Sequence, residues 1–218
     1  MVHLWPEADK AEVARLLKSR TPTDFPFWPD ARPSQRPPAG TWRIWLILAG
    51  RGFGKTRTII EWAHYQAMTH PGCRGSIVGA TVDDARDILV DGESGFLNAI
   101  PEANRPIHEA SKRRLTWPNG SVATLFSADK PDRLRGKQCH WAIVDELAAW
   151  RYQDAWDQLL FGLRLGQDPR VAIATTPRPT TLIRDLIKDS TCHVTRGTTY
   201  ENRDNLAPAF FEQVIRRY

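Results

Sequence analysis

The stretch from Leu46 to Thr56 constrains the fold most, because an apolar run, a glycine-rich turn and the start of a helix follow one another there. The apolar run begins at Ile44 and predicts a buried strand. Glycines at 50, 52 and 54 let the backbone approach an anion with its N–H groups turned inward. The following helix presents its positive N-terminal end to the same charge. The stretch therefore predicts a phosphate-binding loop at the end of a strand.

The side chains after the turn match this chemistry. Lys55 is expected to meet the β- and γ-phosphates of ATP, and the Thr56 hydroxyl is expected to ligate Mg²⁺. The full G-x-x-x-x-G-K-[ST] pattern needs glycine at position 49, where this chain has alanine. An ordinary glycine-rich turn is the alternative, but it does not explain why Gly54, Lys55 and Thr56 directly follow a buried strand. The loop residues expected to contact nucleotide are Gly50, Arg51, Gly52, Phe53, Gly54, Lys55 and Thr56.

A second signal is the apolar run Trp141 to Val144, which ends in Asp145 and Glu146. A carboxylate at the end of a buried strand is costly without a charged partner, and Mg²⁺ bound to nucleotide is such a partner. We expect Asp145 to hold the Mg²⁺ shell and Glu146 to orient and deprotonate the attacking water. Chance could produce this pattern alone, but its position about ninety residues after a phosphate loop favours function.

Two further features are weaker. Val171 to Ala174 predicts another buried strand, and the hydroxyls of Thr175 and Thr176 before Pro177 could sense the γ-phosphate. A simple Thr-Pro turn is the alternative. Gln35 lies in a proline-rich stretch before the loop, where a glutamine can read the adenine edge, although a solvated side chain is the commoner outcome.

The order of the remaining patterns predicts an α/β fold with a mostly parallel sheet flanked by helices. Asn119-Gly120 between alternating runs predicts an inserted antiparallel β-hairpin. We expect an N-terminal helix and proline-rich arm over residues 1–40, an ATPase core over 41–197 and the start of a linker over 198–218. The expected helices are Glu7–Ser19, Lys55–Thr69, one from Thr81 with Ala85, Ile88 and Leu89 on its buried face, Pro179–Lys188 and Ala207–Tyr218. The other expected strands are Ser76–Ala80, Arg114–Trp117, Ser121–Phe126 and Cys192–Thr195.

Composition narrows the class of protein. With 218 residues, 41% hydrophobic and 25% charged, the chain fits one globular core, and no apolar run approaches the ~20 residues of a membrane span. We therefore expect no membrane association. The net charge of +5 favours polyanionic partners such as nucleic acid.

The chain resembles the large terminase subunit of tailed bacteriophages, the motor that packages DNA. The resemblance runs from about Gln35 onward and rests on an ordered set of motifs. These are Trp42–Arg57, Asp91–Gly95, Pro131–Gly136, Val144–Ala148, Thr175–Thr180 and Tyr200–Leu206. The family tolerates alanine at the first loop position.

The resemblance implies a P-loop NTPase of the additional-catalytic-glutamate, RecA-like type. By resemblance Lys55 and Thr56 are phosphate and Mg²⁺ ligands, and Asp145 and Glu146 are the Walker B and catalytic residues. Arg51 resembles the family's cis-acting arginine and Arg135 its trans-acting arginine finger. Thr175, Thr176 and Pro177 resemble its coupling motif.

The resemblance also implies partners and a location. These are double-stranded DNA, the portal protein of the procapsid, the small terminase subunit and a homo-oligomeric ring, expected to be a pentamer, with the free domain a monomer. A virus-encoded protein of this kind would act in the host cytoplasm and be absent from the mature virion. Relatives continue into a nuclease domain, so we expect this chain to be an ATPase domain without nuclease activity.

Two rival functions remain open. A helicase-like, DNA-dependent ATPase would need a second RecA-like domain that this chain lacks. A non-catalytic DNA-binding module with a degenerate loop would be expected to have lost Lys55, Asp145 or Glu146, and all three are present.

Overall fold

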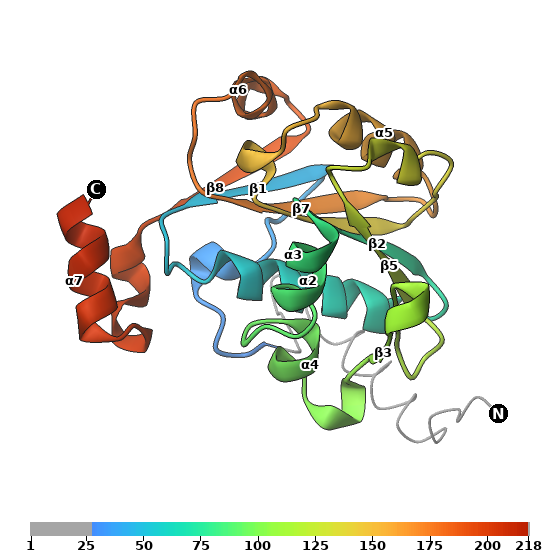
Figure 1. Ribbon diagram of the computed structural model, residues 1–218, viewed down its shortest axis with the longest axis horizontal. Coiled ribbons are helices and arrows are strands. Elements are labelled where there is room, and N and C mark those ends of the chain that lie inside the picture. Colours follow the sequence, from blue (N-terminus) through green and yellow to red (C-terminus); the bar gives the residue numbers. More distant parts are fainter. Residues whose placement is uncertain (1–27, 218) are drawn as a thin grey trace.

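The structure is a computed structural model that describes residues 28–217. The helix expected at Glu7–Ser19 lies outside these residues. Within them, one mixed sheet of eight strands is flanked by helices on both faces (Figure 1). The α/β prediction is therefore confirmed.

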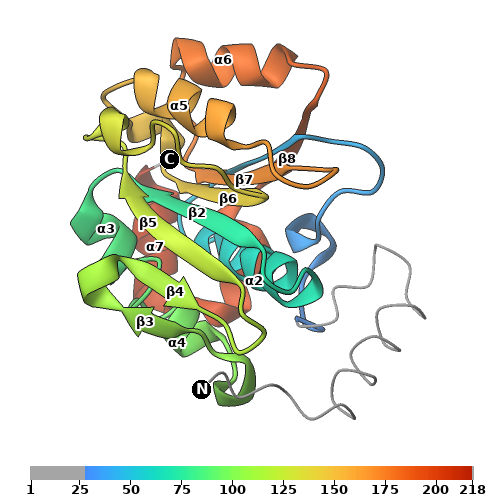
Figure 2. The same ribbon diagram turned by 90° about the vertical axis from the view of Figure 1, so that its right-hand side faces the viewer.

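Six neighbouring strands of the sheet are parallel, in the order β5-β2-β6-β7-β1-β8. Antiparallel β4 and β3 extend the sheet beyond β5 (Figure 2). The strand bounds are β1 Ile44–Ala49, β2 Arg74–Gly79, β3 Ile107–Glu109, β4 Arg114–Thr116, β5 Val122–Ser127, β6 Trp141–Asp145, β7 Arg170–Thr175 and β8 Cys192–Gly197.

Helices cover both faces of the sheet (Figure 1). α2 and α4 cover one face of the sheet, while α5 and α6 cover the other. The helix bounds are α2 Lys55–Thr69, α3 Val82–Asp87, α4 Phe96–Ala99, α5 Asp154–Gly162, α6 Thr181–Lys188 and α7 Pro208–Arg217. Among the described residues, no helix is long and apolar enough to span a membrane.

β1 shows why the central strands are apolar throughout. Its side chains alternate between faces, so Trp45 and Ile47 join the core under α2 while Leu46 and Leu48 join the core under α5 and α6. Every residue of β1 is buried. A strand covered by helices on both faces needs apolar residues at every position, which is what a continuous run supplies.

The predicted hairpin is confirmed by the antiparallel pairing of β4 with β5. β5 also pairs in parallel with β2, so the hairpin is continuous with the main sheet. The sequence patterns did not predict the short strand β3 or the helix α5. The strand is only three residues long, and α5 follows a turn without a side-chain N-cap hydrogen bond.

A local expectation was wrong in part. Thr81 caps α3 as predicted, accepting a hydrogen bond from the Asp84 N–H at 3.0 Å, but the helix ends at Asp87 and Ile88 is 42% exposed. The apolar residues at helical spacing therefore continue past the end of α3. In the proline-rich stretch, Pro33–Gln35 forms a short 3-10 turn, which proline at its first position permits.

Candidate nucleotide site

The order of the strands brings the predicted motifs together at one edge of the sheet. β7 lies between β1 and β6, with Leu48 opposite Thr175 and Asp145 opposite Ala174. All three strands are parallel, so the residues that follow them meet at the carboxyl ends, where open α/β sheets bind ligands. Residues that lie far apart in sequence thus form one cluster.

The turn at residues 50–54, which the resemblance implies to be a Walker A motif and which is named the Walker A turn for that reason, has the backbone of an anion-binding loop. Gly52 and Gly54 have φ angles of 78° and 94°, in the left-handed region that favours glycine. Gly54 is the N-cap residue of α2, so the turn leads directly into the positive end of that helix. Ala49 closes β1 and is fully buried, so the methyl group at this deviant position is accommodated in the core.

Lys55 is held at the centre of the cluster. Its side chain is 8% exposed, and Nζ donates hydrogen bonds to the carbonyls of Ala49 at 2.9 Å and Gly50 at 3.1 Å. It also donates to the Thr176 hydroxyl at 3.4 Å. Burial lowers the pKa of Lys55, while the neighbouring carboxylates oppose that shift. The amine is therefore a largely desolvated cation beside the turn, where phosphate charge would be strongly attracted.

Asp145 is a buried carboxylate at the end of β6. Its exposed fraction is 7%, and burial raises its pKa to about 7, with a further rise from Glu146 and Asp84 and a decrease from Lys55. Asp84 was not predicted as part of the site. A carboxylate at the end of β6 and a threonine hydroxyl at the start of α2 are oxygen donors of the kind that Mg²⁺ takes in small number together with phosphates. Thr56 and Asp145 are therefore compatible with the metal role expected for them.

Glu146 is fixed by three hydrogen bonds. Its own N–H donates to the Ala174 carbonyl at 2.7 Å. Its carboxylate accepts from the Thr176 N–H at 3.2 Å and from the Thr176 hydroxyl at 3.0 Å. Since the same hydroxyl accepts from Lys55, Thr176 connects the candidate base to the candidate phosphate lysine.

The three residues of the segment Thr175-Thr176-Pro177 lie in different environments. The Thr175 hydroxyl is fully buried and accepts a hydrogen bond from the Ala148 N–H at 3.1 Å, which ties β7 to the turn after Glu146. Thr176 faces the cluster and Pro177 is exposed. Thr176 and Pro177 also line a cavity of about 370 Å³ beside the Walker A turn. Residues of α7 line the same cavity.

The other expected site residues lie at different distances from this cluster. Arg51 is exposed, yet close enough to influence the Lys55 pKa. Gln35 is 2% exposed and packs against Gly54. Arg135 is on the surface, with its side chain 71% exposed and paired with Asp132. Among the described hydrogen bonds and ion pairs, none joins Arg135 to Lys55, Asp145 or Glu146.

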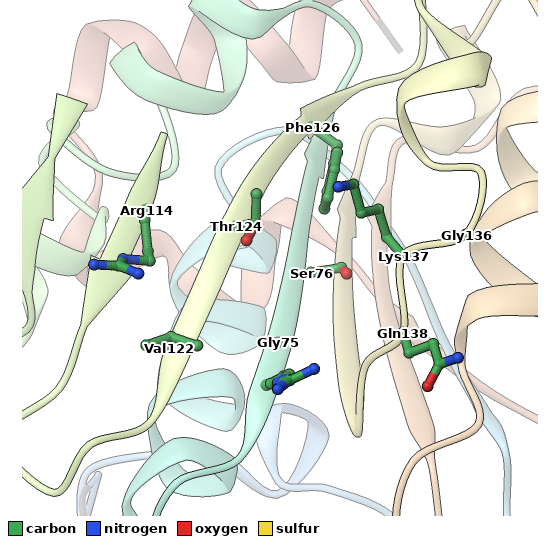
Figure 3. Close-up of a pocket in the computed structure, with 10 residues that line it drawn as sticks. Gly75, Ser76, Arg114, Val122, Thr124, Phe126, Gly136, Lys137 and Gln138 are labelled. Atoms are coloured by element: carbon green, nitrogen blue, oxygen red, sulfur yellow. The ribbon is translucent and has the colours of Figure 1, made fainter. Parts of the chain in front are cut away.

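A larger cavity, of about 620 Å³, lies away from this cluster over β2 and β5 (Figure 3). Arg114 from β4 and Lys137 from the chain before β6 stand on opposite sides of it. Arg114 is engaged by Glu109. The larger cavity contains none of the predicted catalytic residues, so its size does not mark the nucleotide site.

Three residues outside the predicted site contact the carbonyls of the Walker A turn. They are Arg32, Thr199 and Asn202. Thr199 begins the 3-10 segment Thr199–Asn205, which is separated from β8 by Thr198 alone. β8 pairs with β1 so that Gly197 lies opposite Ala49. The motif Tyr200–Leu206 signalled part of this region, but no local pattern showed which atoms it meets.

The sheet order and the glycine turn that leads into α2 define a P-loop NTPase fold, with Lys55, Asp145 and Glu146 clustered at one edge of the sheet. A family model described as "Terminase large subunit, T4likevirus-type, N-terminal" matches residues 46–218. The chain belongs to this family. Comparison with curated protein sequences gave no match.

Solved structures of phage large terminases share the fold. The large terminase ATPase domain of Thermus phage P74-26 has 16% identity and a TM-score of 0.65, with 89% of this chain and 97% of that chain covered. The large terminase of a thermophilic bacteriophage in complex with ATP-gamma-S has 16% identity and a TM-score of 0.67, with 89% and 47% covered. For the HK97 bacteriophage large terminase the values are 19%, 0.57, 78% and 38%. This chain therefore spans nearly all of the Thermus phage ATPase domain but about half of the terminase chain solved with ATP-gamma-S.

Proposed function

We propose that this chain is the ATP-hydrolysing motor domain of a viral large terminase, which couples hydrolysis to translocation of double-stranded DNA into a procapsid. The observation that carries the proposal is the Thr176 hydroxyl, which donates to Glu146 and accepts from Lys55. It links the candidate base, the phosphate lysine and the coupling segment in one chain of contacts.

In the proposed reaction, Glu146 accepts a proton from the water that attacks the γ-phosphate of ATP. Lys55 and the N–H groups of the Walker A turn stabilise negative charge on the phosphates. Thr56 and Asp145 would hold Mg²⁺, which when bound neutralises phosphate charge. The products are ADP and inorganic phosphate. Arg51 is proposed to act on the ATP of its own subunit.

Arg135 is proposed to act on the ATP of a neighbouring subunit. Its exposure and its lack of a described contact with its own Walker residues support a role outside its own site. A planar guanidinium suits the spread charge of a transferring phosphoryl group. This role requires a homo-oligomeric ring, proposed to be a pentamer, while the free domain would be a monomer with slow hydrolysis.

The family and the net charge of +5 support the remaining partners. We propose double-stranded DNA, the portal protein of the procapsid and the small terminase subunit, with action in the host cytoplasm. The second candidate is a helicase-like, DNA-dependent ATPase, which would act together with a second RecA-like domain. Stimulation of ATP hydrolysis by double-stranded rather than single-stranded DNA would favour the packaging motor.

The first test compares nucleotide binding and single-turnover hydrolysis in two variants. Lys55→Ala should abolish ATP·Mg²⁺ binding, because it removes a desolvated charge that faces the phosphates. Glu146→Gln should bind ATP like wild type but hydrolyse it ~10²–10⁴-fold more slowly, the usual contribution of a general base.

Lys188→Ala provides the matched control, since it removes an exposed lysine at the end of α6. It should leave both binding and hydrolysis unchanged. Wild-type nucleotide affinity in a folded Lys55→Ala protein would refute the binding site. A normal rate in Glu146→Gln would assign the activation of water to another residue.

A further inference from the structure

All three central carbonyls of the Walker A turn accept hydrogen bonds from side chains outside the turn. Thr199 Oγ1 donates to the Arg51 carbonyl at 2.8 Å. Asn202 Nδ2 donates to the Gly52 carbonyl at 2.6 Å, and the Arg32 guanidinium donates to the Phe53 carbonyl. The turn is therefore held from its outer side.

This arrangement bears directly on anion binding. In a planar peptide the carbonyl and the next N–H point in opposite directions. A loop that turns its N–H groups toward a phosphate must therefore turn its carbonyls away from it. Fixing the outward carbonyls fixes the direction of the inward donors. Preorganised donors bind charge better, because they need no reorganisation when the ligand arrives.

Arg32 and Asn202 also hold each other. Arg32 Nη1 donates to Asn202 Oδ1 at 2.7 Å, and that oxygen accepts a further hydrogen bond from Asn205 at 3.0 Å. The Arg32 guanidinium also lies 5.0 Å from the centre of the Phe53 ring. Phe53 is fully buried, and a Cβ at Gly197 would overlap its ring. Arg32, which precedes β1, and Asn202, which follows β8, are therefore bonded to each other and to the Walker A turn.

We propose that Arg32 and Asn202 are positioning residues that hold the Walker A turn in its phosphate-binding conformation. This inference rests on the proposed nucleotide site, because its effect on affinity is exerted at that turn. Neither residue needs to touch the nucleotide. Their action passes through the Gly52 and Phe53 carbonyls, which distinguishes them from Lys55.

The chemistry of each side chain suits this task. A guanidinium has several donors in a fixed plane, so Arg32 can reach the Phe53 carbonyl and Asn202 together. A lysine would keep the charge but replace the planar fork with a single ammonium centre. The amide of Asn202 donates to Gly52 and accepts from Arg32, whereas aspartate at this position would have no donor for the Gly52 carbonyl.

Ser34 and Glu201 supply a matched control. Ser34 Oγ donates to Glu201 Oε2 at 2.9 Å, which joins the same two segments at an exposed position. This hydrogen bond contacts no carbonyl of the turn. Ser34→Ala therefore weakens the docking of the two segments without releasing the turn, so it separates positioning from general stability.

The experiment measures ADP·Mg²⁺ affinity by calorimetry, and amide hydrogen exchange over residues 50–55 in nucleotide-free protein. Arg32→Ala and Asn202→Ala should each bind ADP about 10-fold to 100-fold more weakly, which is the range for a lost hydrogen bond of this kind. Arg32→Lys should recover part of the affinity. Amides of the turn should exchange faster in both alanine variants than in wild type or Ser34→Ala.

The double variant Arg32→Ala/Asn202→Ala should be less than additive, because the two side chains share one network. Unchanged ADP affinity and unchanged exchange in the alanine variants would overturn the inference. An effect of Ser34→Ala as large as that of Asn202→Ala would also overturn it, because segment docking alone would then explain the result. If wild type binds no ADP, the proposed function fails, and amide exchange still decides whether the two side chains position the turn.

Discussion

Glu146 adopts a left-handed backbone conformation, with φ of 48°, which costs free energy for a residue other than glycine. The hydrogen bond of its N–H to Ala174 and the two bonds from Thr176 to its carboxylate fix this conformation. Arg113 has a similar φ of 51° next to the β4 strand, where no candidate site lies. At Glu146, unlike at Arg113, the left-handed conformation lies within the candidate site, because the Thr176 hydroxyl links the Glu146 carboxylate to Lys55.

Glu61 is a second buried carboxylate, on α2, and it gives a prediction about pH. It is 2% exposed and forms an ion pair with Arg57 at 2.6 Å. Burial raises its pKa from 4.5 to about 7, and Arg57 opposes that rise. The folded protein therefore binds more protons than the unfolded chain between these pH values. The contribution of Glu61 to the free energy of unfolding is therefore greatest below pH 4.5 and falls as the pH rises to about 7.

Glu61→Gln removes this titration. The difference in free energy of unfolding between wild type and Glu61→Gln should fall by roughly 1–3 kcal/mol from pH 4.5 to pH 8, at about 1.4 kcal/mol per pKa unit. Urea unfolding at several pH values measures it. Glu212→Gln, at an exposed position on α7, should leave the pH dependence unchanged. If the free energy of unfolding depended on pH in the same way in wild type and Glu61→Gln, the raised pKa of Glu61 would be contradicted.

At the level of elements, the contact of β2 with β6 depends on Gly75, which has no side chain. Gly75 in β2 lies opposite Trp141 in β6, and the Trp141 ring occupies the place of a Cβ at Gly75. Trp141 is 1% exposed, so the ring has little room to move. Close-packed cores do not accept added atoms without strain.

Gly75→Ala should therefore lower the free energy of unfolding by about 1–3 kcal/mol, the usual cost of overpacking. Denaturant unfolding would measure the loss. In a Trp141→Phe background, where the larger ring is absent, the same substitution should cost less. An equal cost in both backgrounds would place the strain somewhere other than at the Trp141 ring.

At the level of the whole molecule, the proposed motor needs more than one copy of this chain. Lys55, Asp145 and Glu146 converge within one subunit, whereas Arg135 stands exposed beside Asp132. If Arg135 completes a neighbouring site, Arg135→Ala should bind ATP like wild type but fail to hydrolyse it in a homogeneous ring. Arginines supplied in this way contribute ~10³–10⁵ in rate.

Mixed rings test the assignment. Arg135→Ala and Glu146→Gln subunits should each be inactive alone, yet some ATPase activity should return when they assemble together. An Arg135→Ala subunit keeps Glu146 and can receive Arg135 from its neighbour. Arg133→Ala, at an exposed neighbouring position, should be milder. Absence of activity in rings shown to be mixed would remove the proposed trans role.

The sequence by itself determined the features that depend on local physics. The bounds of α2 were predicted correctly, because Gly54 precedes the helix as its N-cap residue and Pro71-Gly72 ends the pattern. The apolar runs at β1, β6 and β7 predicted buried strands, since a strand covered on both faces must be apolar throughout. The predicted positions of Lys55 at the start of α2 and of Asp145 and Glu146 at the end of β6 followed from the same local patterns.

Tertiary structure alone decided which of these residues meet. The placement of β7 between β1 and β6 brings Thr176 to Glu146 and Lys55, and this placement depends on pairing between strands far apart in sequence. The contacts of Arg32 and Asn202 with the Walker A turn span 21 and 150 residues. Hydrogen bonds between distant residues leave no periodic pattern in the chain, so only the folded backbone shows that these side chains hold the turn.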